Sequence, residues 1–142
     1  MDPCEALHAL TANALSPRSR ERDPDLVDGI VALRSATAQD PAGWRAQAAA
    51  GAGYDSGGRE ARIAAPTLVV HGSDDVVLDP ANAALLADTM PGAVLVTLEE
   101  VGHLLYWEEP RSVAGLVARF LVGQDPRGDT TAEAGDTTAE AG

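Results

Sequence analysis

The second half of this sequence alternates short apolar runs with helical patterns, and this order constrains the fold more than any other feature. The apolar run 68–70 is closed by Gly72, which predicts a strand covered on both faces within a parallel sheet. Asp79-Pro80 then predicts the start of a helix, and a second strand is predicted at 94–98. Strand, helix and strand in this order are typical of a parallel β-α-β unit.

The clearest helical pattern in the chain follows Pro110. One face of this segment is apolar at helical spacing, so a final helix is predicted to pack on the sheet. The residues on that face are Val113, Leu116, Val117, Phe120 and Leu121. From residue 63 onwards the predicted order is therefore strand, helix, strand, helix, and the fold class is α/β.

Three Asp-Pro pairs in the first half predict helix starts, because each places a side-chain acceptor at an N-cap and a proline at the first helical position. The pairs are Asp2-Pro3, Asp23-Pro24 and Asp40-Pro41. Glu5 completes a capping-box spacing with Asp2, and Ser16-Pro17 is predicted to end the first helix. Residues 1 to about 50 are therefore predicted to be helical.

Charge and cysteine content narrow the classes of partner. The chain carries 22 acidic against 10 basic residues, a formal net charge of -12, which disfavours binding to nucleic acids and to anionic membranes. The single cysteine, Cys4, excludes an intrachain disulfide and is expected to be a buried, small apolar residue. The first residues lack the pattern of a secretory signal, and no apolar run is long enough to span a bilayer, so a cytoplasmic location is expected.

The C-terminal segment 124–142 is predicted to be disordered. It ends in two copies of Asp-Thr-Thr-Ala-Glu-Ala-Gly, at 129–135 and 136–142, with no large apolar side chain in either copy. Such a segment cannot bury enough apolar surface to offset the entropy lost on ordering, so it is interpreted as a solvated acidic tail.

A carboxylate and an imidazole are predicted at one edge of the sheet. Asp75 follows the first strand, and His103 follows the second strand after Gly102. Both loops leave the carboxyl ends of parallel strands, so the two side chains are expected to lie within hydrogen-bonding distance, as an orienting acid and a general base. His71, at the end of the first strand, is interpreted as structural. A metal site built from these residues and Asp74 is conceivable, but no His-x-x-x-His or Cys-x-x-Cys spacing supports it, so no metal is expected.

Four segments, in order and in register, resemble the end of the α/β-hydrolase core. They are Ala65-Pro-Thr-Leu-Val-Val-His-Gly-Ser-Asp-Asp-Val-Val-Leu-Asp-Pro80, Met90-Pro-Gly-Ala, Val101-Gly-His-Leu104 and Glu109-Pro110. The resemblance extends from about residue 63 to 121. It implies that Asp75 is the family's acid and His103 its histidine, in the family's order Ser, Asp, His, and that no cofactor is needed.

The resemblance divides the chain into three parts. Residues 1–62 resemble helical cap segments and the linker that returns to the core. Residues 63–123 resemble the C-terminal βαβα portion of a doubly wound α/β-hydrolase sheet, and residues 124–142 are the predicted tail. Val76 and Leu104 directly follow the two catalytic positions and are candidates to line an apolar substrate pocket, with core packing as the equal alternative.

The family's nucleophile lies in a Gly-x-Ser-x-Gly elbow that precedes the cap, and this sequence contains no such motif. Gly53-Tyr54-Asp55-Ser56-Gly57 imitates an elbow with an aspartate nucleophile. No buried strand is predicted before it, so it is interpreted as a linker. The isolated chain is therefore expected to be inactive.

Two functions remain open. The first is hydrolysis of a small, largely apolar ester, lactone or carbon-carbon substrate by a Ser-Asp-His triad whose serine lies outside this sequence. The second is that of a non-catalytic remnant, or of a partial subunit completed by a separate N-terminal chain. Such an N-terminal half, or a second copy of the chain, is the expected protein partner.

Overall fold

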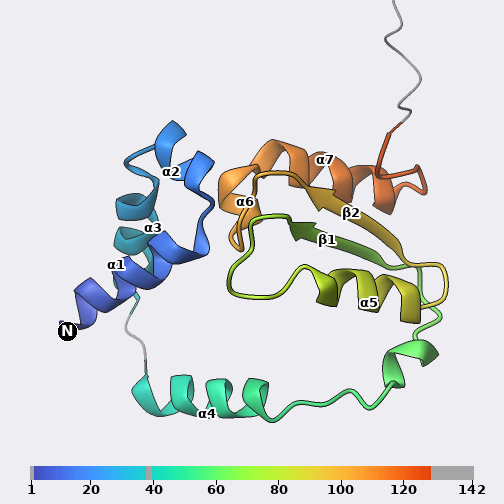
Figure 1. Ribbon diagram of the computed structural model, residues 1–142, viewed down its shortest axis with the longest axis horizontal. Coiled ribbons are helices and arrows are strands. Elements are labelled where there is room, and N and C mark those ends of the chain that lie inside the picture. Colours follow the sequence, from blue (N-terminus) through green and yellow to red (C-terminus); the bar gives the residue numbers. More distant parts are fainter. Residues whose placement is uncertain (1, 38–39, 129–142) are drawn as a thin grey trace, which may run out of the picture.

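The order of elements agrees with the predicted α/β class. The computed structural model describes residues 2–37 and 40–128. Its two strands, with the helices between and after them, form the predicted βαβα unit (Figure 1). The elements in chain order are α1 (Pro3–Ala14), α2 (Pro17–Arg22), α3 (Leu26–Ser35), α4 (Pro41–Ala52), the 3-10 helix η1 (Arg59–Arg62), β1 (Leu68–Gly72), α5 (Ala81–Thr89), β2 (Val94–Leu98), α6 (Leu105–Glu108) and α7 (Pro110–Leu121).

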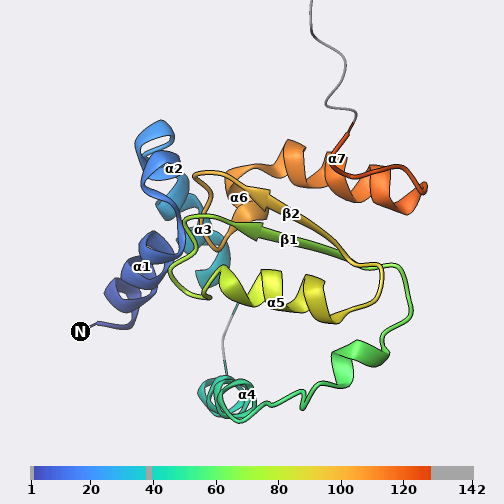
Figure 2. The same ribbon diagram turned by 45° about the vertical axis from the view of Figure 1, so that its right-hand side comes forward.

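The sheet consists of β1 and β2, which pair in parallel. Leu68 lies beside Val94 at one end and Gly72 beside Leu98 at the other. Figures 1 and 2 show α5 and α7 on opposite sides of this pair, so both faces have a helical neighbour. Most strand residues are half-buried rather than fully covered, because within the described residues neither strand has a second neighbour.

Two of the three predicted helix starts have the expected caps. The Asp2 carboxylate accepts a hydrogen bond from the Cys4 amide, and Glu5 accepts one from the Asp2 amide, which confirms the capping box. Asp40 accepts from two backbone amides in the first turn of α4. These side chains satisfy amides that have no partner inside their own helices.

The prediction for Asp23 is wrong. The N-cap of α3 is Asp25, because the Asp23 carboxylate accepts from the Asp25 amide and forms a turn before the helix begins. Ser16-Pro17 ends α1 as predicted, but it also begins α2, which was not predicted. The Ser16 hydroxyl accepts from the Ser19 amide, so the proline becomes the first residue of a new short helix.

An apolar core cluster joins the helical half of the chain, α1 to α4, to the loop after β2. Leu104, from that loop, packs among side chains of α1 and α3. The members of the cluster are Ala14, Leu15, Val27, Ile30, Val31 and Leu104. Both views show α1 to α3 beyond the tips of the strand arrows (Figures 1 and 2), so these three helices lie at the carboxyl edge of the sheet.

α4 and the first turn of α1 contribute no residue to this cluster. α4 has no buried residue. The prediction that Cys4 is buried is wrong, because α1 meets the cluster through Leu7, Ala12 and Ala14 while Cys4 is exposed on the first turn. None of the helices within the described ranges is long and apolar enough to cross a lipid bilayer.

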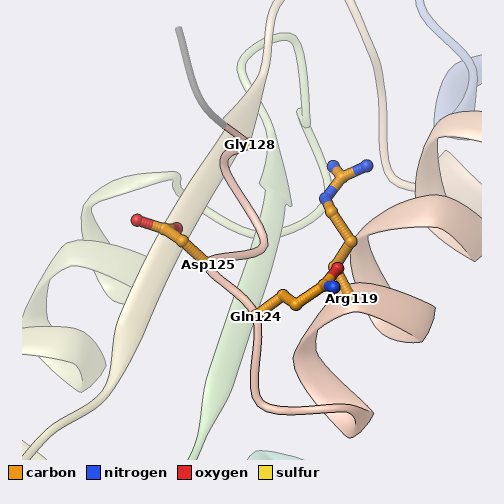
Figure 3. A pocket seen from close by; sticks show the side chains of 4 residues that line it. All are labelled: Arg119, Gln124, Asp125 and Gly128. Carbon is orange, nitrogen blue, oxygen red and sulfur yellow. The ribbon is translucent and has the colours of Figure 1, made fainter. Parts of the chain in front are cut away.

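The turn after α7 lies at the amino edge of the sheet, because α7 runs back along the strands (Figure 1). Nε and Nη2 of Arg119 donate to the carbonyl oxygen of Pro126 at 3.0 and 2.6 Å and fix this turn. A cavity of about 380 Å³ beside it is lined by Arg119, Gln124, Asp125 and Gly128 (Figure 3). The segment predicted as a tail is thus described as far as Gly128, and residues 129–142 lie outside the described residues.

Candidate active site

Asp75 and His103 meet at the carboxyl edge of the sheet. The loop after β1 carries Asp75, and the loop after β2 carries His103. Oδ2 of Asp75 lies 2.9 Å from Nδ1 of His103, which confirms that the two side chains are within hydrogen-bonding distance. The carboxylate side chain is 3% exposed and the imidazole 34% exposed. The pair therefore consists of a buried acceptor and an imidazole that solvent can reach.

Close contact between the two loops sets this geometry. The Asp74 amide donates to the carbonyl oxygen of Val101 at 2.9 Å, which bonds the loop after β1 directly to the loop after β2. Gly72 makes the approach possible, because a Cβ at this residue would lie 2.2 Å from the same Val101 oxygen. The positions of the acid and the imidazole are thus fixed relative to each other through the backbone.

The second oxygen of Asp75 anchors the residues that follow it. Oδ1 accepts from the amides of Val77 at 2.8 Å and Leu78 at 2.9 Å. Burial raises the pKa of Asp75, but the hydrogen bonds from Leu78, His103 and Val77 outweigh it, so the pKa lies below that of an ordinary aspartate. Asp75 is therefore kept ionised as the acceptor for His103.

A second histidine lies beside the same carboxylate. Nε2 of His71 is 3.4 Å from Oδ2 of Asp75 and 3.3 Å from the carbonyl oxygen of Leu78. These contacts tie the end of β1 to both ends of the 75–78 turn. They agree with the interpretation of His71 as a structural residue.

Replacing Asp75 by asparagine is expected to destabilise the fold in a pH-dependent way. Because the pKa in the folded chain lies below the unfolded value of about 3.9, ionised Asp75 stabilises the fold above that pH, and the contribution is lost as the pH falls through the folded pKa. We expect Asp75→Asn to cost about 1–3 kcal/mol of unfolding free energy at pH 7 and less near pH 3, which is below the unfolded pKa. Urea unfolding at the two pH values measures this difference.

The neighbouring Asp74 provides the control. Its carboxylate accepts from the Ser73 hydroxyl at 3.2 Å, and an amide oxygen can accept the same bond. Asp74→Asn should therefore change the unfolding free energy at pH 7 by no more than about 0.5 kcal/mol. Equal losses in the two variants, or a loss in Asp75→Asn that does not decrease between pH 7 and pH 3, would show that ionised Asp75 does not stabilise the fold.

A buried glutamate, Glu108, holds the backbone beside His103. Its carboxylate accepts from the amide of Gly102 at 3.0 Å and from the amide of Ser16 at 3.0 Å. The amide of His103 itself donates to the carbonyl oxygen of Ala14 at 2.8 Å. The imidazole is thus supported by the helical half of the chain as well as by the sheet.

The sequence patterns did not single out Glu108, because two glutamates stand side by side before Pro110 and only Glu109 belongs to the segments that resemble the family. One available signal was its spacing. Glu108 follows Leu104 by four residues, so in a helical turn the two side chains share a face. A short apolar and acidic turn next to the predicted imidazole could therefore have indicated a buried acceptor.

The two candidate pocket residues lie in different surroundings. Val76 is exposed on the turn after Asp75, whereas Leu104 is buried. Leu104 packs in the apolar cluster with α1 and α3. This position agrees with core packing, the alternative to lining a substrate pocket.

The segment that imitates a nucleophile elbow lies in the linker between α4 and β1. α4 ends at Ala52 and η1 follows at Arg59–Arg62, so a helix precedes the segment where an elbow requires a strand. The Asp55 carboxylate accepts from the Gly57 amide at 2.8 Å, which is a local turn contact. These features agree with the linker interpretation.

Comparisons with known proteins show the same family as the sequence motifs. The profile of the family described as "TAP-like protein" matches residues 34–132, which is more than half of the chain. A solved structure, described as "Est816 as an N-Acyl homoserine lactone degrading enzyme", is similar with a TM-score of 0.66 and 33% identity. The similarity covers 84% of this chain and 48% of that one.

Curated relatives match a shorter segment. Monoacylglycerol lipase abhd6-A of Xenopus laevis is 40% identical over 60 residues, which are 42% of this chain and 18% of that protein. The putative non-heme bromoperoxidase BpoC of Mycobacterium tuberculosis is 36% identical over 58 residues, which are 41% of this chain and 22% of that protein. The chain spans about a fifth of the length of these relatives and about half of Est816. Because the family profile covers most of the described sheet and helices, the chain belongs to the α/β-hydrolase family.

Proposed function

We propose that this chain is the part of a serine hydrolase that carries the acid and the base of a Ser-Asp-His triad. The observation that carries the proposal is the 2.9 Å contact between Oδ2 of the buried Asp75 and Nδ1 of His103. A carboxylate in this position keeps a proton on Nδ1, so that Nε2 can take the proton of a nucleophile. Membership of the family supports the same roles.

In the proposed reaction, a serine hydroxyl attacks the carbonyl carbon of an ester or lactone. His103 accepts the serine proton and delivers it to the leaving oxygen, while Asp75 stabilises the imidazolium. Water then releases the acyl group with His103 again as the base. The serine and the amides that hold the oxyanion come from an N-terminal half, which is the protein partner we propose.

We propose a small, largely apolar ester or lactone as the substrate. Est816 is described as degrading N-acyl homoserine lactones and abhd6-A as a monoacylglycerol lipase, and both names denote acyl compounds. Val76 and Val77, which follow Asp75 directly, are exposed apolar side chains. They support an apolar contact beside the reacting carbonyl.

The test supplies the remaining portion of a related enzyme. The full chain is fused to, or co-expressed with, the portion of Est816 that lies outside the match, since the match covers 48% of that enzyme. We expect the assembled protein to hydrolyse p-nitrophenyl butyrate and an N-acyl homoserine lactone, and the chain alone to show no turnover above background. Covalent labelling by a fluorophosphonate reports an activated serine independently of the substrate.

Far-UV circular dichroism and size-exclusion chromatography establish that the assembly is folded. Turnover and labelling that both depend on the full chain support the triad. A folded assembly that neither turns over substrate nor is labelled contradicts the proposed function and favours a non-catalytic remnant.

A further inference from the structure

We infer that Glu108 is a positioning residue for His103, acting through the backbone amides of Gly102 and Ser16. The effect on turnover that we expect from this role rests on the proposed function. Glu108 is 2% exposed and is the largest fully buried side chain among the described residues. Its place in the hydrogen-bond network, rather than its chemistry with a substrate, defines this role.

Both oxygens of Glu108 accept hydrogen bonds from backbone amides. One amide lies in the loop that carries His103, and the other lies at the start of α2. Oε1 accepts from Gly102 at 3.0 Å, and Oε2 accepts from Gly102 at 3.1 Å and from Ser16 at 3.0 Å. A buried acceptor with several donors is costly to change, because each amide that loses it is left without a partner. Gly102 directly precedes His103, so the peptide that carries the base is one of the groups held.

The peptide before His103 has little room to move. A Cβ on Gly102 would lie 2.7 Å from the Ser16 nitrogen, 2.8 Å from the Ala14 carbonyl oxygen and 2.9 Å from Oε1 of Glu108. The His103 amide donates to that same Ala14 oxygen at 2.8 Å. The peptide that precedes His103 is therefore enclosed by the end of α1, the start of α2 and the Glu108 carboxylate.

The same carboxylate also docks the helical half. Ser16 and Glu108 are 92 residues apart in the chain, and their hydrogen bond joins the start of α2 to the end of α6. Arg22, at the end of α2, donates to the Glu108 carbonyl oxygen and pairs with the Glu109 carboxylate. The Glu108 side chain thus takes part both in placing His103 and in joining α2 to α6.

Glu108→Gln separates this role from simple filling of space. The volume is unchanged, but Gly102 lies within reach of both oxygens, so either orientation of the amide brings an NH2 group against the Gly102 N–H. In the assembled hydrolase we expect kcat to fall about 10- to 100-fold with KM changed less than about twofold, because the base is misplaced while the substrate contacts remain. Steady-state kinetics on ester and lactone separates the two constants.

The matched control is Glu109→Gln. Glu109 is the adjacent glutamate and pairs with Arg22 near the surface. Its substitution should leave kcat within about twofold of the parent, since an ion pair between partly exposed side chains contributes little.

A second readout does not depend on turnover. In the full chain alone, nitrogen-15 spectra of the His103 ring report which nitrogen carries the proton, and the contact with Asp75 predicts Nδ1. In Glu108→Gln, a larger fraction of the His103 rings should carry the proton on Nε2, and hydrogen exchange of the Gly102 amide should be faster. Both measurements are made below the melting temperature of the variant. Glu108→Asp, which keeps the carboxylate on a shorter stem, should give an intermediate change in both signals and serves if the glutamine variant does not fold.

The outcomes separate this inference from the proposed function. Faster exchange at Gly102 in any folded variant, with ring signals and kcat equal to the parent, would overturn the positioning role and leave Glu108 as a packing residue. A shifted ring signal in the full chain, with no turnover in any folded assembly, would support the positioning role and contradict only the proposed function.

Discussion

Removing the proposed base by His103→Ala, in the hydrolase assembled with a serine-bearing half, is expected to lower kcat/KM by about 10⁴- to 10⁶-fold. His103 is the imidazole that the buried Asp75 carboxylate contacts at 2.9 Å. A methyl group can neither take the serine proton nor return it to the leaving oxygen, so both halves of the reaction lose their proton carrier. The loss should appear mainly in kcat, because the substituted side chain removes an interaction of the transition state.

The matched control is His8→Ala. His8 lies on α1 and its Nε2 pairs with Asp28 at 3.1 Å, with both side chains exposed. An exposed pair of this kind contributes little, so kcat/KM should stay within about twofold of the parent and the melting temperature should change little. A loss below about 10-fold in a folded His103→Ala protein, or similar losses in the two variants, would mean that another group is the base.

Local chemistry predicted most of the elements. Capping by Asp2 and Asp40, and the apolar runs that form β1 and β2, depend on residues close in sequence, so the pattern alone was sufficient. The pairing of the two strands and the proximity of Asp75 and His103 followed from the crossover, because a strand-helix-strand unit leaves both loops at one edge.

The errors and omissions have physical causes. Asp23 and Asp25 both precede α3. The hydrogen bond from the Asp25 amide to the Asp23 carboxylate forms a turn, and this turn makes Asp25 the N-cap. α2 and α6 are too short for a periodic pattern to predict. Sequence spacing alone therefore resolves neither competing caps nor single helical turns.

The surroundings of the candidate site were harder to predict than the pair itself. Glu108 reaches Ser16 across 92 residues, and Leu104 packs among helices from the start of the chain. Neither contact can be predicted from residue spacing, because each depends on how two distant segments pack. The burial of Leu104 is therefore a tertiary effect.

Gly72→Ala is expected to destabilise the fold by about 3 kcal/mol or more. A Cβ on Gly72 would lie 2.2 Å from the Val101 carbonyl oxygen and 2.5 Å from the Gly102 carbonyl oxygen. Both neighbours are backbone atoms, so no side chain can swing aside to make room. The loop that carries His103 would have to move away from the end of β1.

This movement should separate Asp75 from His103 as well as lower the free energy of unfolding. The Asp74 amide would lose its 2.9 Å contact with the Val101 oxygen, and with it the link that fixes Asp75 relative to His103. We therefore expect the Nδ1 proton signal of His103 to broaden or shift in any folded Gly72→Ala protein, in addition to a lower midpoint of urea unfolding.

Gly29→Ala provides the control for the added methyl group. Gly29 lies inside α3, where a Cβ would meet no heavy atom within 4 Å, so alanine should be neutral or stabilise the helix by up to about 1 kcal/mol. Urea unfolding of the two variants compares the change in unfolding free energy caused by one methyl group at a crowded position, Gly72, and at an open position, Gly29. If Gly72→Ala unfolds at the same urea concentration as the parent, the two loops are not in the close contact that holds Asp75 against His103.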